Sequence, residues 1–251
     1  MLKDSIPGLR AARLQKHRGS YRAICFDLDG VLLDTMPFHA QAWQDALKHF
    51  GGRVSRRLIY AWEGESGTVT AKTLLRGTRI GPSRQAEQEL LRIKEHRFRQ
   101  LGRRVRMARS HQQLLRHLSG QRVPIALVTG TSQSEVRRVI PDRILKLFGI
   151  VVTGDGVRHG KPHPEPYRTA MQRLRVVPRQ TIVVENAPYG IQSARRAGAG
   201  LVIAVPSSLP RRFLQQAHLI CSSNRLASFL PFLTGVKPYG FSQKLAGVMS
   251  P

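Results

Sequence analysis

The chain has 251 residues and a formal net charge of +26, because 41 Lys and Arg residues outnumber 15 Asp and Glu residues. Its hydrophobic content of 41% is enough to build a core, which excludes wholesale disorder. No stretch approaches the roughly 20 apolar residues that a membrane-spanning helix needs, so we expect no membrane partner. Two cysteines define neither a disulfide framework nor a metal knuckle, which indicates a cytoplasmic protein.

The positive charge is carried mostly by Arg, the side chain best shaped for bidentate contacts with phosphate. The electrostatic field of such a positive charge can attract nucleic acid, anionic membranes or small phosphates. The Arg residues run through most of the chain and form no single stripe, which favours a general bias of composition. We therefore do not expect nucleic acid as a partner.

In chain order, residues 1–20 form a basic extension that lacks the apolar segment of a secretory signal. The first strand is expected at residues 22–26, followed by helices at 37–50, 56–61, 69–75 and 83–101. Strands at 123–128, 150–153, 181–184 and 200–205 then alternate with helices at 110–118, 132–140, 164–174 and 187–197. This alternation predicts an α/β fold, with a parallel sheet covered by helices on both faces. A poorly ordered tail is expected at residues 234–251.

The segment between the first two strands is unusual, because about a hundred residues are far too many for one crossover. It is predicted to be almost entirely helical. Its first helix places its apolar residues on one face, namely Phe38, Ala42, Trp43, Ala46, Leu47 and Phe50. We therefore expect an all-helical cap at residues 36–109, inserted into a core made of residues 21–35 and 110–233.

Polar residues follow the predicted strands where each one ends: Asp27 and Asp29, then Thr129, then Lys161 in a loop, then Glu185 and Asn186. In open parallel sheets, ligands bind beyond the carboxyl ends of the strands. An Asp-x-Asp-Gly run by itself also suits a plain turn. The agreement between four strand ends argues against a turn alone and predicts one shared site.

This residue set suits phosphoryl transfer. Asp27 and Asp29 point to the same side of an extended chain, so Asp27 can attack phosphorus while Asp29 serves as acid and then as base for water. Thr129 and Lys161 can hold the phosphate by a hydroxyl bond and a point charge. The Mg²⁺ that such a reaction needs prefers oxygen ligands. They are expected from Asp27, the backbone near Asp29, and Glu185 or Asn186.

The runs FDLDGVLLDT, LVTGTS, GKPHPEPY and VVENAPYGIQSARRAGA resemble, in order and spacing, the four motifs of the haloacid dehalogenase superfamily. The resemblance covers residues from about 22 to 230. It implies a Rossmann-like core with a helical cap that closes over the site, and it gives Asp27 and Asp29 the roles named above. It also implies phosphate anchors at Thr129, Gly130 and Lys161. The namesake dehalogenases usually lack the second Asp, so Asp29 indicates phosphate chemistry.

The stretch TMPFHAQAW resembles the β-phosphoglucomutase-like branch of that superfamily, with His39 at the start of the cap. Where many relatives carry Glu-Asp-Ser, this chain has Glu185-Asn186-Ala, so one negative charge is missing from the implied metal site. The variant also resembles phosphatases of the branch, including an inorganic-pyrophosphatase-like group. In that comparison Glu63 reaches the site from the cap as a metal or water ligand. The alternative interpretation is that Glu63 is a solvated glutamate at a helix end.

His39 is a candidate for contact with the substrate. The alternative is that it only caps the first cap helix or packs against it. Trp43 and Trp62 are expected to pack within the cap, and His159 and His163 are given no role.

The favoured function is a Mg²⁺-dependent phosphohydrolase for a small soluble phosphate ester or anhydride, of the sugar-phosphate, phosphoglycolate or pyrophosphate type. A phosphomutase of the β-phosphoglucomutase type is the alternative. It would need cap residues for a second phosphate, and the candidates Arg76, Arg79 and Arg84 match no defined motif. A nucleic-acid-binding protein on the same scaffold is a more distant alternative. The oligomeric state is left open.

Overall fold

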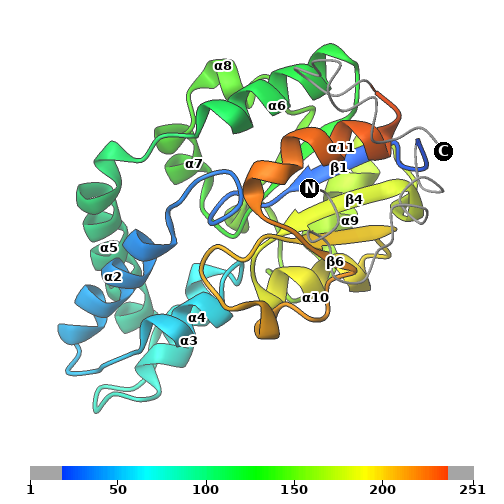
Figure 1. The fold of residues 1–251 in the computed structure, drawn as a ribbon. Coiled ribbons are helices and arrows are strands. Elements are labelled where there is room, and N and C mark those ends of the chain that lie inside the picture. Colours follow the sequence, from blue (N-terminus) through cyan, green and yellow to red (C-terminus); the bar gives the residue numbers. More distant parts are fainter. Residues whose placement is uncertain (1–18, 237–251) are drawn as a thin grey trace.

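A computed structural model describes residues 19–236, which form a sheet with helices on both faces and a group of helices beyond one end of that sheet (Figure 1). The expectations for residues 1–18 and 237–251 fall outside the described residues. No helix between residues 19 and 236 has both the length and the apolar character that crossing a bilayer requires.

The sheet has six parallel strands in the order β3-β2-β1-β4-β5-β6. The strands are β1 (Ala23–Phe26), β2 (Ile125–Val128), β3 (Ile150–Val152), β4 (Thr181–Glu185), β5 (Leu201–Ala204) and β6 (Leu219–Ile220). The chain first adds β2 and β3 on one side of β1, and then β4, β5 and β6 on its other side. The direction in which strands are added therefore reverses between β1 and β4. Ligands of such sheets bind in the crevice at this reversal. The expected α/β fold is confirmed.

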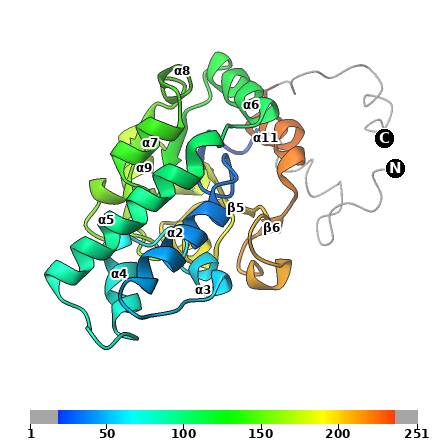
Figure 2. The ribbon, with the colours of Figure 1, turned by 90° about the vertical axis from the view of Figure 1, so that its left-hand side faces the viewer.

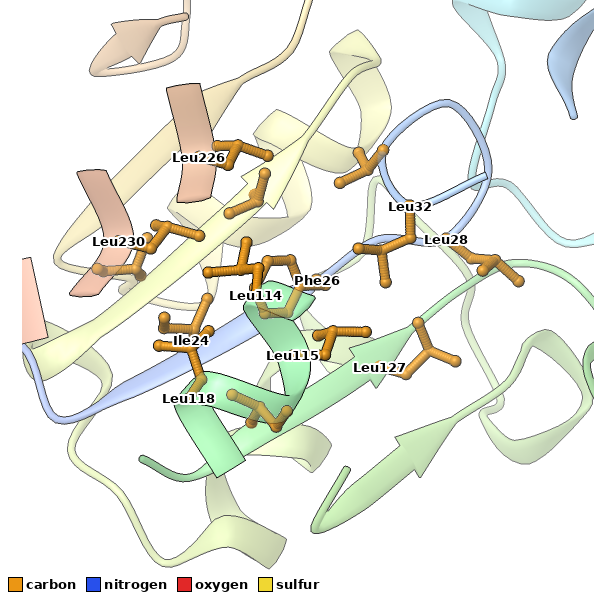
Figure 3. Close-up of a cluster of buried hydrophobic side chains, with 14 of the residues drawn as sticks. Ile24, Phe26, Leu28, Leu32, Leu114, Leu115, Leu118, Leu127, Leu226 and Leu230 are labelled. Atoms are coloured by element: carbon orange, nitrogen blue, oxygen red, sulfur yellow. The ribbon is translucent and has the colours of Figure 1, made fainter. Parts of the chain in front are cut away.

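Each face of the sheet has its own helices. Ile24 and Phe26 of β1 point to one face, where leucines of α6 (Arg109–Gly120) and α11 (Leu226–Thr234) cover them (Figure 3). Cys25 points to the other face, against α9 (Glu165–Leu174) and α10 (Pro188–Arg196). Successive side chains of a strand alternate between faces, so one short apolar strand supplies both layers of the core.

Four helices lie between β1 and α6 in the sequence: α2 (Met36–Lys48), α3 (Arg56–Ala61), α4 (Gly67–Leu75) and α5 (Arg84–Leu101). Figures 1 and 2 show these helices together, and in Figure 1 they lie on the side toward which β1 runs. They share a separate apolar core that includes Trp43, Leu47 and Leu90. Ser55, Ser66 and Ser83 cap the last three helices by accepting backbone N–H bonds. We propose residues 36–109 as the cap.

The structure corrects several predicted boundaries. β2 begins at Ile125 and not at residue 123, because Pro124 has no N–H to donate to a neighbouring strand. α2 ends at Lys48 and not at Phe50, just before Gly51 with its φ of +70°. α4 begins at Gly67 and not at residue 69, because Ser66 provides the cap.

Several short elements were not predicted. The two residues of β6 and the single turn of α8 (Asp142–Leu145) are too short to show a period, and α11 contains Pro231. α7 (Gln133–Val139) lies close to its expected range. Short 3₁₀ helices occur at Gly102–Arg104, Gly154–Gly156, Pro178–Gln180, Arg211–Phe213 and Ser223–Arg225.

Candidate active site

A cavity of about 240 Å³ lies between the strand ends of the core and the cap. The core lines it with Asp27, Asp29, Thr129 and Gly130, and the cap lines it with His39, Glu63 and residues of α4 and α5. The predicted residues Lys161, Glu185 and Asn186 form hydrogen bonds with residues of this lining or with each other. The structure therefore brings together every residue predicted for the site.

Lys161 is a buried cation beside Asp27, only 1% exposed. Its Nζ lies 2.6 Å from Asp27 Oδ1 and 2.6 Å from Glu185 Oε1, and it also donates to the carbonyl oxygen of Val128 at 3.1 Å. Burial lowers the pKa of Lys161, but the two carboxylates outweigh burial and hold it above its ordinary value. Lys161 is therefore a fixed positive charge beside Asp27.

Glu185 is held in place by protein donors on both oxygens. Its Oε1 accepts from Lys161 and from the Tyr167 hydroxyl at 2.5 Å, and its Oε2 accepts the backbone N–H of Asn186 at 3.0 Å. Gly190 leaves room for it, because a Cβ there would lie 1.9 Å from Glu185 Oε1. Tyr167 was not predicted as a site residue, although it lies in the same motif as Lys161.

Asp29 accepts hydrogen bonds on both carboxylate oxygens. Oδ1 accepts from the Thr35 hydroxyl at 2.5 Å and lies 3.2 Å from His39 Nε2. Oδ2 accepts from the hydroxyls of Thr131 at 2.7 Å and Thr129 at 3.2 Å. Burial alone would raise the pKa of Asp29, but the charge of His39 and these hydrogen bonds outweigh it, so the pKa lies below its ordinary value.

Thr35 and Thr131 were missed as site residues. A signal for Thr131 existed, because it lies two positions after Thr129, a spacing that can bring two side chains to the same side of the chain. His39 was expected to contact the substrate or to pad its helix. Its ring stacks on Phe98, with centroids 3.9 Å apart, while its Nε2 faces Asp29.

Glu63 enters the site from the cap, directly after α3. Its Oε2 accepts a 2.7 Å hydrogen bond from Asn186 Nδ2, and the residue is only 9% exposed. The alternative of a solvated glutamate at a helix end is therefore wrong. Burial raises the pKa of Glu63, and the charges of Asp27 and Asp29 raise it further. The expected packing of Trp43 and Trp62 in the cap core is observed, and both also line the cavity.

The loop after Glu63 lies directly on the core. Gly64 has a φ of +85°, and a Cβ at this position would lie 2.5 Å from Lys161 Cδ. A Cβ on Gly130 would lie 2.9 Å from the carbonyl oxygen of Gly64. Glycine at both positions lets the two backbones approach, so the structure has the cap closed over the site.

The carboxylates around Asp27 outnumber the cations. Asp27 and Glu185 share the single ammonium group of Lys161, and burial together with Glu185 and Asp29 raises the pKa of Asp27 against the effect of Lys161. Four buried side-chain oxygens have no hydrogen-bond partner among the described residues, and three of them belong to this group: Asp27 Oδ2, Glu63 Oε1 and Asn186 Oδ1. Unpaired buried oxygens of this kind are costly, and a hard divalent cation prefers such ligands. The residues present therefore fit a metal ion.

Most of the chain matches a known protein family. Residues 24–204 match the model of the family described as haloacid dehalogenase-like hydrolase. The "Phosphorylated carbohydrates phosphatase" of Thermotoga maritima is 30% identical, over 74% of this chain and 86% of that protein. The "(DL)-glycerol-3-phosphatase 1, mitochondrial" of Arabidopsis thaliana is 29% identical, over 86% of this chain and 72% of that protein.

Among solved structures, "Putative beta-phosphoglucomutase from Bacteroides vulgatus" superposes with a TM-score of 0.76 at 26% identity. The match covers 90% of this chain and 99% of that chain. The chain belongs to the haloacid dehalogenase-like hydrolase family.

Proposed function

We propose that this enzyme is a Mg²⁺-dependent phosphohydrolase that works through an aspartyl-phosphate, and that its substrate is a small phosphate ester or anhydride. The observation that carries the proposal is the pair Asp27 and Asp29 at the end of β1, with Lys161 2.6 Å from the first and His39 3.2 Å from the second. Relatives named as phosphatases of glycerol phosphate and of carbohydrate phosphates support this class of activity.

Asp27 has the environment of a nucleophile. Its Oδ1 is fixed by Lys161, which leaves Oδ2 without a partner among the described residues. In the proposed reaction a carboxylate oxygen of Asp27 forms a bond to phosphorus, and the bond from phosphorus to the leaving oxygen breaks. Lys161, the Thr129 hydroxyl and the backbone at Gly130 hold the phosphoryl oxygens.

Asp29 is the proposed general acid and general base. The low pKa of Asp29 corresponds to the ionised form, and the negative charge of a bound phosphate raises that pKa toward protonation. Protonated Asp29 donates its proton to the leaving oxygen. The resulting carboxylate then takes a proton from the water that attacks phosphorus, which breaks the bond to Asp27 and releases inorganic phosphate.

Enzymes of this family generally depend on a metal, and Mg²⁺ is the proposed ion. Asp27, Asn186 and Glu63 are the proposed side-chain ligands because each has an open buried oxygen. When bound, Mg²⁺ would neutralise charge on the phosphoryl group. Both oxygens of Glu185 already accept hydrogen bonds, so its proposed role is to orient Lys161.

The phosphomutase alternative has less support. A mutase needs cations that hold a second phosphate, yet Arg76, Arg79 and Arg84 are exposed and do not line the cavity. The position of the basic residues away from the cavity also supports a small phosphorylated molecule, rather than nucleic acid, as the partner. The basic residues lie mostly outside a cavity of about 240 Å³ that holds the reactive groups.

The test is a phosphate-release screen with Mg²⁺ across sugar phosphates, glycerol phosphate, phosphoglycolate, nucleotides and pyrophosphate. Turnover of at least one compound, lost on chelation and in Asp27→Asn, is expected. Silence across the screen would overturn the hydrolase, and conversion of β-glucose 1-phosphate to the 6-phosphate would support the mutase instead.

A readout independent of activity tests the metal ligands. Mg²⁺ at about 100 times its dissociation constant should raise the free energy of unfolding of the wild type by about 2.7 kcal/mol. The Asn186→Leu variant should lose most of this gain. An equal gain in both proteins would remove Asn186 as a ligand.

We also propose a cytoplasmic location, since Cys25 and Cys221 are both free and buried, which suits a reducing compartment. Recovery of a tagged protein in the cytoplasmic fraction is expected, and its export would contradict the proposal.

A further inference from the structure

The cavity is acidic although the chain is strongly basic. Lys94 is the one Lys or Arg among the described residues that line it. Seven of the 15 acidic residues of the chain line the same cavity, namely Asp27, Asp29, Glu63, Glu65, Glu95, Glu135 and Asp155. The proposed chemistry uses the first three. The other four face the space that remains for the part of the substrate beyond the phosphate.

Glu135 and Lys94 form a buried ion pair across the boundary between core and cap. Glu135 lies on α7 and is 3% exposed, and Lys94 lies on α5 and is 8% exposed. Their charged atoms are 3.5 Å apart, which is longer than the usual 2.7–2.9 Å of a charge-assisted hydrogen bond. The ammonium lies 5.7 Å from the Trp43 ring centre and 5.2 Å from that of Phe98.

This pair is incomplete. Glu135 Oε1 is buried and has no hydrogen-bond partner among the described residues. The one interaction that joins Lys94 Nζ to a carboxylate within the described chain is the long contact with Glu135 Oε2. A carboxylate oxygen accepts hydrogen bonds, and an ammonium group donates up to three. Buried charged groups of this kind are stable only when further hydrogen bonds complete them.

We propose that Glu135 and Lys94 recognise a hydrogen-bond donor on the leaving group, and that the acidic lining rejects substrates with a second negative charge. This inference rests on the proposed phosphohydrolase function. A hydroxyl group satisfies both partners, because it donates to Glu135 and accepts from Lys94. An amino group satisfies Glu135 and is attracted by Glu65 and Glu95.

The preferred substrates are therefore monophosphates of polyols or amino-alcohols. A carboxylate or second phosphate could accept from Lys94, but it would face Glu135 and the acidic residues beside it. Such like-charge contacts are a common means of rejecting wrong ligands. Among the substrate types expected from the sequence, this favours sugar-type phosphates over phosphoglycolate and pyrophosphate.

The experiment compares kcat/KM, at saturating Mg²⁺, for five phosphate compounds. Glycerol 3-phosphate and 3-phosphoglycerate differ in a hydroxymethyl group against a carboxylate. Phosphoethanolamine tests the amino group, n-propyl phosphate lacks any donor, and pyrophosphate carries a second phosphate. The wild type should prefer glycerol 3-phosphate over 3-phosphoglycerate by about 100-fold in kcat/KM. The reason is that the buried carboxylate of Glu135 would face the carboxylate of 3-phosphoglycerate.

The variant Glu135→Gln keeps the shape and removes the charge. It should reduce that preference about tenfold or more. The control Glu89→Gln makes the same change on the same helix as Lys94, at a residue that pairs with Arg92 and does not line the cavity. It should leave every ratio unchanged.

The outcomes separate the two proposals. If none of the five compounds nor any of the wider screen releases phosphate, the proposed function itself fails. If phosphate is released but 3-phosphoglycerate or pyrophosphate is turned over as fast as glycerol 3-phosphate, the inference fails while the function stands. The wild-type ratios alone decide this point even if Glu135→Gln does not fold. Preference for phosphoethanolamine over glycerol 3-phosphate would identify the donor as an amine.

Discussion

The two walls of the cavity are built by different physical means. The core wall presents its reactive groups from the ends of parallel strands, where Asp27 and Asp29 follow a strand whose four residues are fully buried. The cap wall presents Glu63 from the end of a helix, and Lys94 and His39 from helix faces. The backbone of the core wall is fixed by the sheet. The position of the cap wall depends on how the cap helices pack and on how the loop after Glu63 contacts the core.

This difference suggests a division of labour. Groups that must approach the phosphorus atom are attached to the most rigid part of the chain, where positional errors are smallest. Groups that read the rest of the substrate are attached to an insertion that has its own core and can move as a unit. Substitutions in the core wall should therefore affect the chemical step, and substitutions in the cap wall should affect closure and selectivity.

The largest effect is expected in the core wall, from Asp27→Asn. Loss of the proposed nucleophile should reduce kcat by at least about 10⁴-fold, as expected when a group that bonds to the substrate is removed. The melting temperature should not fall, because a surplus buried carboxylate is removed. The control Asp34→Asn, at an exposed position in the same loop, should keep kcat within about twofold. Turnover by pure Asp27→Asn near the wild-type rate would exclude Asp27 as nucleophile.

The next effect is expected where the two walls meet, from Gly64→Ala. A Cβ would overlap Lys161, and the positive φ adds about 1 kcal/mol of backbone cost. The cap should close less completely, so kcat/KM should fall about tenfold or more. Gly81→Ala is a matched control, since Gly81 has a φ of +70° and no neighbour within 4 Å of an added Cβ. Equal kcat/KM values for the two variants would contradict the closure argument.

A smaller effect is expected at the contact between His39 of the cap and Asp29 of the core. The charge of His39 helps to hold the pKa of Asp29 below its ordinary value, so removing that charge raises the pKa of Asp29. In His39→Gln, the limb of the pH–rate profile that requires ionised Asp29 should move to higher pH, by about one unit. His49→Gln, at an exposed position after α2, should leave the profile in place. An unmoved limb in His39→Gln would show that His39 acts on packing alone.

The smallest effect concerns the cap by itself. Arg97 of α5 donates two hydrogen bonds to Asp45 of α2, at 2.8 and 3.2 Å, and the pKa of Asp45 is lowered. Asp45→Asn should cost about 0.5 kcal/mol of unfolding free energy at pH 7, the scale of an ion pair that solvent still screens. A lowered folded pKa stabilises the protein above the unfolded pKa of about 3.9, and this contribution is lost as the pH falls through the folded pKa. The difference between wild type and variant, measured in urea, should therefore shrink toward pH 3, and activity at pH 7 should not change.

The fold class and the grouping of residues in the core wall could be predicted from the sequence. Alternating strands and helices imply a parallel sheet, and such a sheet brings its carboxyl ends to one edge, so Asp27, Thr129 and Asn186 could be grouped without coordinates. Their roles stay proposals until the variants are assayed. Thr35 and Tyr167 lie within recognised motifs, but only their hydrogen bonds to Asp29 and Glu185 indicate a part in the site.

For the cap wall, the sequence offered His39 and Glu63 as candidates with alternatives, and their contacts follow only from the tertiary structure. Glu63 meets Asn186 across 123 positions of sequence, and no local period specifies such a pairing. The pairing of Lys94 with Glu135 likewise depends on how α5 docks against α7, and both residues would pass for solvated helix positions in the sequence. Strand ends are aligned by backbone hydrogen bonds that obey general rules. The docking of a helical insertion depends on side-chain packing that is specific to this chain.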